Sequence, residues 1–102
     1  MKLRYFAFFS VLLLLGCAAE EVDVEKSAVI LAGTNVNGFE SCDWVIQFNN
    51  EFNTKVVPVS LDVAFQQNAL EVQVVVTNST ELADCVAGNP VKVRIISIRE
   101  AN

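Results

Sequence analysis

The sequence contains no histidine, and this absence removes several kinds of chemistry. Serine and cysteine nucleophiles that depend on an imidazole base are excluded, and so are zinc sites completed by histidine. Glycine and proline are scarce, with four and two residues, and neither a glycine-rich phosphate loop nor a calcium loop of alternating acids is present. Nothing marks Lys26, Lys55 or Lys92 as a buried partner for a serine. We therefore expect no enzymatic activity, no metal and no cofactor.

Positive charge is also scarce, because seven Lys and Arg residues stand against twelve Asp and Glu, for a net charge of −5. Binding to phosphate backbones requires clustered Lys and Arg, so this composition argues against a nucleic-acid partner. It argues equally against electrostatic attraction to anionic lipid. The sequence shows no internal repeat and no low-complexity segment, and its length allows one domain at most.

What the sequence does have is a leader. Lys2 and Arg4 are followed by an apolar run from Tyr5 to Leu15, and Gly16 is the small residue after it. This order is typical of a secretory signal, and the run is too short to span a bilayer as a mature helix. The pattern predicts a signal peptide over residues 1–16.

The segment Leu14-Leu15-Gly16-Cys17 resembles the lipobox of bacterial lipoproteins, although Leu15 is bulkier than the usual residue before the glycine. The resemblance implies cleavage before Cys17, a diacylglycerol on its thiol and acylation of the new amine. Each buried CH₂ contributes about 0.8 kcal/mol, so two or three acyl chains would hold a small domain firmly on a membrane. A plain secretory leader with an incidental cysteine and an uncleaved N-terminal helix are the two alternatives.

Ala18 follows the cysteine where Asp would imply retention at the inner membrane. The resemblance therefore implies outer-membrane delivery, and it leaves open the periplasmic face or the cell surface. Residues 17–26 then form an acidic tether, which is also similar to the export tag of some Bacteroidetes-type surface lipoproteins. Loss of Lys2 and Arg4 with the leader leaves five basic against twelve acidic residues, a net charge of −7.

If Cys17 carries lipid, Cys42 and Cys85 are the only two thiols left, in an oxidising compartment. A domain of this size has a small apolar core and is usually stabilised by a covalent cross-link such as a disulfide. We predict a disulfide between them, which would contribute roughly 4 kcal/mol through loop closure. The alternative is a pair of buried free cysteines; their spacing fits no zinc site.

Five segments have strand-like patterns: residues 27–36, 42–48, 54–59, 69–77 and 91–99. In the second, the alternation places Cys42, Trp44, Ile46 and Phe48 in the core and Val45 on the other face. The fourth is the clearest, with Leu70, Val72, Val74 and Val76 on one apolar face.

Local signals refine this pattern. Because proline cannot donate to a ladder, Pro58 indicates that the third segment is at a sheet edge or ends there. Residues 60–68 are expected to form one short helical turn, with Ser60 as N-cap and with Leu61 and Phe65 covering one end of the core. Residues 78–84 are expected to form a polar loop. The phase of the last segment slips after Ile95, which indicates a β-bulge.

Together these elements predict a mostly β domain over residues 27–102: a five-stranded, partly open OB-like barrel, or alternatively a small sandwich. The order Cys42-x-Trp44-x-Ile46, Pro58-x-x-Leu61-x-x-x-Phe65, Leu70-x-Val72-x-Val74, Cys85 resembles small uncharacterised lipoproteins of Bacteroidetes-type bacteria. The resemblance implies a compact barrel with a paired cysteine and no particular activity. Val57 stands where an aromatic is expected, and Asn68 where glycine is commoner; asparagine tolerates the positive φ of a turn.

The expected function is that of a lipid-anchored envelope protein, a non-enzymatic structural or protein-interaction module. The alternative is a small-ligand or glycan-binding module. A glycan-binding module would show exposed aromatic side chains, for which Phe39 and Phe52 are the loop candidates. A purely structural protein would show no pocket with convergent polar groups.

Overall fold

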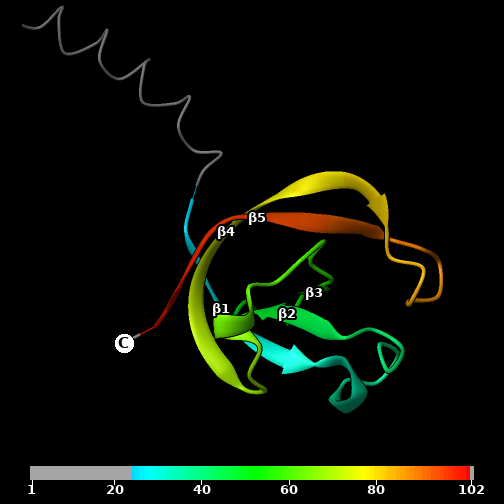
Figure 1. The fold of residues 1–102 in the computed structure, drawn as a ribbon, viewed down its shortest axis with the longest axis horizontal. Coiled ribbons are helices and arrows are strands. Elements are labelled where there is room, and N and C mark those ends of the chain that lie inside the picture. The colour runs from blue at the N-terminus through cyan, green and yellow to red at the C-terminus, as the bar shows by residue number, and fades with distance from the viewer. Residues whose placement is uncertain (1–23, 102) are drawn as a thin grey trace, which may run out of the picture.

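The computed structural model describes residues 24–101, which form a mostly β domain (Figure 1). The predicted signal peptide and the acylation site Cys17 lie outside the described residues. The strands are β1 (Lys26–Ala32), β2 (Trp44–Phe48), β3 (Lys55–Val56), β4 (Leu70–Leu82) and β5 (Val91–Glu100). They form one sheet in the order β3-β2-β1-β4-β5, and every neighbouring pair is antiparallel. In Figure 1 the long β4–β5 hairpin arches over β2 and β3.

The two edges of the sheet meet at one point. Val93 of β5 donates its N–H to the carbonyl of Val57 at 2.9 Å, and its own carbonyl accepts the N–H of Val59 at 2.8 Å. These bonds make an isolated parallel bridge between Pro58 and Val93. No continuous ladder joins β3 to β5 in the described chain, so the sheet is strongly curled and is not closed by hydrogen bonds along its length.

The helical turn predicted for residues 60–68 is wrong in type and in its cap. The chain forms a three-residue 3₁₀ turn, η4 (Val63–Phe65), and the side chain of Asp62, in place of Ser60, accepts a bond from the N–H of Ala64 at 3.0 Å. An Asp two residues before a free N–H makes this bond readily, and it stabilises a turn without requiring a longer helix. The packing prediction is confirmed, because Leu61 is buried and Phe65 packs beside it in the same cluster.

The apolar interior consists of two clusters. The larger one holds Ala28, Ile30, Ile46, Phe48, Leu61, Val72, Val74 and Val93. The smaller one holds Val36, Cys42, Val45, Val57 and Ala83. The prediction that Cys42 shares a face with Ile46 and Phe48 and that Val45 faces outward is therefore wrong. Both faces of β2 are covered, since the loops before β2 and after β4 fold over its second face.

The predicted apolar face of β4 is confirmed, because Val72 and Val74 are fully buried and Leu70 and Val76 pack against the same cluster. The strand is longer than predicted and includes residues 78–82, which were expected to form a loop. In this outer part, β4 pairs with β5 alone, and most side chains are exposed. Polar residues are tolerated there because neither face is fully buried.

The bulge predicted after Ile95 is confirmed. Ser97 pairs with Val75 and Ile95 pairs with Val76, so Ile96 is the extra residue on β5. Its side chain is 56% exposed, whereas Ile95 and Ile98 both pack against the larger cluster. The bulge is what allows the apolar residues on both sides of the phase slip to face the interior.

Asn68 does not hold the positive φ that a turn was expected to need there. That conformation belongs to Ala69, at φ 70°, while the Oδ1 atom of Asn68 accepts the N–H of Ala32 at 2.9 Å. Asn68 thus ties the end of β1 to the chain that enters β4. The left-handed conformation of Ala69 is strained, because its β-carbon lies close to the neighbouring carbonyl oxygen.

Replacing Ala69 by glycine is expected to raise the free energy of unfolding by about 1 kcal/mol, since glycine adopts this conformation without the clash. Urea denaturation would measure the change. The matched control is Ala87→Gly, because Ala87 is exposed and is not among the residues with positive φ. That variant should lose about 0.5 kcal/mol through chain entropy. An equal loss in both variants would contradict the assignment of strain to Ala69.

Candidate binding groove

The described residues contain a groove of about 730 Å³ beside the start of β2. Its polar lining residues are Ser41, Asp43, Ser60, Gln66, Asp84 and Lys92. Its apolar lining residues are Trp44, Val57, Pro58, Val59 and Leu61, together with the two cysteines. The groove therefore gathers residues from the β1–β2 connection, the start of β2, the chain on either side of η4, the β4–β5 loop and the start of β5.

The predicted disulfide is confirmed and forms part of the groove wall. Cys42 and Cys85 are bonded, with their Cα atoms 5.2 Å apart and 43 positions apart in sequence. Cys42 lies two residues before the start of β2, and Cys85 lies in the loop between β4 and β5. The bond ties these two loops together and excludes the alternative of two free thiols.

The main chain of Trp44 has unpaired hydrogen-bonding groups. On one side of β2, Gly33 donates to the carbonyl of Asp43 and Asn49 donates to the carbonyl of Ser27, so the odd-numbered residues face β1. On the other side, Phe48 donates to the carbonyl of Thr54 and Ile46 pairs with Val56.

The main-chain N–H and C=O of Trp44 therefore face the side of β3, because alternate residues of a strand share one hydrogen-bonding direction. The β2–β3 ladder ends before it reaches them, and among residues 24–101 no hydrogen-bond partner is found for either group. The N–H and C=O of Trp44 are thus available at the groove.

Pro58 is the physical reason for this gap. Extending the register of Ile46 with Val56 would place Trp44 opposite Pro58. Proline has no N–H to donate to the carbonyl of Trp44, and the neighbouring residues Val57 and Val59 bond to β5 instead. The prediction that this strand is at an edge or ends at Pro58 is confirmed, because β3 is the outer strand of the sheet and ends at Val56. The opening that this leaves on β2 was not foreseen from the sequence.

The groove carries charge of both signs. Asp43, Asp84 and Lys92 all line it, and the described residues contain no ion pair that involves any of them. No cluster of three or more metal-ligating side chains is found among residues 24–101. The charged groups of the groove can thus form hydrogen bonds and ion pairs with groups from outside the described chain.

The aromatic residues are distributed differently from the expectation. Phe52 is 78% exposed at a loop tip, and Phe39 packs against the smaller cluster. Neither lines the groove, whereas the half-buried Trp44 does. A second hollow, of about 550 Å³, lies beside Phe48, whose ring centroid is 5.7 Å from the Nζ atom of Lys26.

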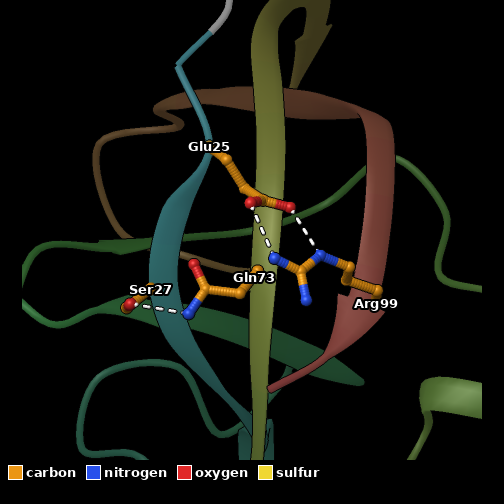
Figure 2. A network of polar contacts seen from close by, with 4 residues as sticks. All are labelled: Glu25, Ser27, Gln73 and Arg99. Atoms are coloured by element: carbon orange, nitrogen blue, oxygen red, sulfur yellow. Dashed lines mark hydrogen bonds and ion pairs between the residues drawn. The ribbon is translucent and has the colours of Figure 1, made fainter. Parts of the chain in front are cut away.

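An ion pair joins the start of the domain to its last strand (Figure 2). The Nε and Nη2 atoms of Arg99 donate to the two carboxylate oxygens of Glu25 at 2.9 and 3.0 Å, and Glu25 reaches across β4 to do so. The hydrogen bond from Arg99, together with its charge, lowers the pKa of Glu25. Gln73 on β4 donates to the hydroxyl of Ser27 at 2.9 Å beside this pair.

Because the folded-state pKa of Glu25 is depressed, the ion pair stabilises the fold above the ordinary value of 4.5 and this contribution disappears as the pH falls through the lower folded value. We expect Arg99→Gln to lower the melting temperature slightly at neutral pH and to leave it unchanged at about pH 2. Arg94→Gln is the control, since Arg94 makes no ion pair with the described residues. A deficit of Arg99→Gln that persisted in acid would contradict the pairing.

No helix within residues 24–101 has the length and apolar character needed to cross a membrane. Comparison of the chain with protein families, with curated proteins and with solved structures finds no match.

Proposed function

We propose that this chain is a lipid-anchored protein of the bacterial cell envelope and that its β domain is a non-enzymatic protein-interaction module. The observation that carries the proposal is the groove beside β2. Six polar residues line it, and the N–H and C=O of Trp44, which have no hydrogen-bond partner in the described chain, face the side of β2 on which β3 lies. The Gln66 amide already donates to the carbonyl of Leu61 at 2.8 Å, but a purely structural domain has no need to gather the other polar groups on one concave surface.

The proposed architecture is an OB-like barrel that is partly open. Support comes from the strand order β3-β2-β1-β4-β5 together with the parallel contact between Pro58 and Val93. In OB folds, ligands bind on the face of the second and third strands between the β1–β2 and β4–β5 loops. The groove lies at the start of β2 and the end of β3, between the corresponding loops, and this position agrees with that usage.

The proposed anchor is a diacylglycerol on Cys17, and the proposed location is the outer membrane. The support is the resemblance of Leu14-Leu15-Gly16-Cys17 to a lipobox and the Ala18 that follows it. Intact mass measurement of the native protein should show a diacyl adduct, and Cys17→Ser should lose both the adduct and the membrane fraction. An unmodified native mass would overturn the anchor without affecting the groove.

A second candidate is a small-ligand or glycan-binding module of the same OB-like design. The specific observation in its favour is that Trp44 lines the groove among polar residues, since a sugar ring stacks on an aromatic face and hydrogen-bonds around its rim. If this candidate holds, cell-wall oligosaccharides would raise the melting temperature of the protein in thermal-shift measurements.

Photo-crosslinking in the native envelope tests the interaction module directly. A photoreactive amino acid in place of Ser60, which is exposed at the groove, should form a protein adduct of defined mass. The same amino acid in place of Glu51, exposed in the β2–β3 turn outside the groove, is the control. Absence of an adduct at Ser60, or an identical adduct at both positions, would overturn the proposed function.

A further inference from the structure

We propose that the groove binds an extended peptide segment of a partner protein, which adds to the exposed edge of β2 by pairing with the main chain of Trp44. The inference rests on the proposed function and specifies the chemistry of its partner. The mode of recognition is strand addition, in which main-chain bonds supply affinity and the surrounding side chains supply selectivity.

The first argument is the identity of the free groups. The N–H and the C=O of Trp44 belong to one residue and point in the same direction, at the end of a ladder whose previous pair is Ile46 with Val56. The complement of such a pair is the C=O and N–H of one residue in an extended peptide. A sugar offers hydroxyl groups in many directions and has no need for a donor and an acceptor at strand spacing.

The second argument is that the protein itself cannot fill the gap. The residue opposite Trp44 in the β2–β3 register is Pro58, which lacks an N–H. The chain around it is held away by two bonds to Val93, at 2.9 and 2.8 Å. The edge of β2 at Trp44 is therefore kept open by bonds elsewhere, and pairing with an added strand requires no native hydrogen bond to break.

The third argument is the composition of the walls. The half-buried residues Trp44 and Val59 offer apolar surface, and Asp43, Asp84 and Lys92 lie around it. Successive side chains of an extended peptide point in opposite directions. A suitable peptide thus presents an apolar side chain toward Trp44 and Val59 and polar side chains on its neighbouring residues.

The experiment titrates the ¹⁵N-labelled full-length protein in detergent with blocked pentapeptides that alternate threonine with a central valine, serine, lysine or glutamate. The expected result is a saturable shift of the Trp44 amide resonance, strongest for the valine peptide. Methylation of one main-chain nitrogen at a time should weaken binding by about tenfold at the residue that faces Trp44, and much less at its two neighbours. Chitobiose is titrated in parallel.

The chain has two prolines, and replacing each of them by valine gives a test variant and a matched control. Pro58→Val restores an N–H opposite Trp44, so it should extend the β2–β3 ladder, slow hydrogen exchange of the Trp44 amide and reduce peptide binding by about tenfold. Pro90→Val, in the β4–β5 loop outside the groove, should leave both unchanged.

The inference is overturned if no peptide shifts the Trp44 amide, if the methylated peptides bind alike, or if chitobiose alone binds. It is also overturned if the Trp44 amide of the unliganded wild type is already protected from exchange. Should Ser60 still crosslink to a partner in these cases, the interaction module would stand and only the strand-addition chemistry would fall. The methylation series uses the wild type, so it decides the matter even if Pro58→Val fails to fold.

Discussion

Removing the Cys42–Cys85 bond is expected to lower the free energy of unfolding by about 4 kcal/mol, which is a large share of the stability of a small domain. The bond joins residues 43 positions apart, and its loss restores the conformational freedom of this loop to the unfolded chain. The clean form of the experiment compares the oxidised and the reduced protein in urea, with Trp44 fluorescence as the probe. Both samples then have the same side chains.

The double variant Cys42→Ala, Cys85→Ala separates two effects. It loses the bond and also the sulfur atom of Cys42, which is only 5% exposed in the smaller cluster. We expect it to be less stable than the reduced wild type by about 1 kcal/mol, because a small cavity replaces the sulfur. If the oxidised and the reduced protein unfolded at the same urea concentration, the disulfide would contribute nothing to the free energy of unfolding, which would contradict this prediction.

The sequence correctly predicts the strands in which one face is buried and the other is exposed, because their residues alternate between apolar and polar. The alternation from Leu70 to Val76 identified β4, and the phase slip after Ile95 identified the bulge at Ile96. Both signals are local, because a two-residue period and its interruption are visible within one segment. Pro58 likewise marked an edge through a property of its own backbone.

The errors have a common physical cause. Val45 was placed outside because its strand alternates, yet it is fully buried against Val57 and Ala83. No pattern within β2 reveals that two distant loops cover its second face. The positive φ at Ala69 was assigned to Asn68 for the same reason, since the amide of Asn68 is committed to Ala32, 36 residues away.

The groove could not be predicted from the sequence, because it depends on main-chain groups that stay unpaired where several distant segments meet. The sequence contains Trp44 and Pro58, and each was assigned its own local role. Only the register of β2 with β3 shows that the one stands opposite the other, and only the bonds to Val93 show why the gap stays open. A site of this kind depends on long-range pairing, which a single sequence does not specify.

Gly33→Ala is expected to lower the free energy of unfolding by about 3 kcal/mol, the second-largest effect. Gly33 opens the 3₁₀ turn η3 (Gly33–Asn35) directly after β1, and its N–H donates to the carbonyl of Asp43 at 3.0 Å. A β-carbon at this position would collide with the carbonyl oxygen of Cys42 and lie 2.7 Å from that of Phe39. These atoms are main chain and cannot turn aside, so the loop that carries Cys42 must move.

Gly38→Ala is the matched control for this substitution. Gly38 has φ 90° and open space around its Cα, so alanine there meets only the conformational cost of about 1 kcal/mol. Urea denaturation of both variants, in oxidised form, should rank Gly33→Ala as the less stable by about 2 kcal/mol. Because the displaced loop also forms one wall of the groove, the Trp44 amide resonance should shift in Gly33→Ala and stay in place in Gly38→Ala. Equal destabilisation of the two would show that the contact at Gly33 relaxes freely and that the close approach of Gly33 to Cys42 does not constrain the loop.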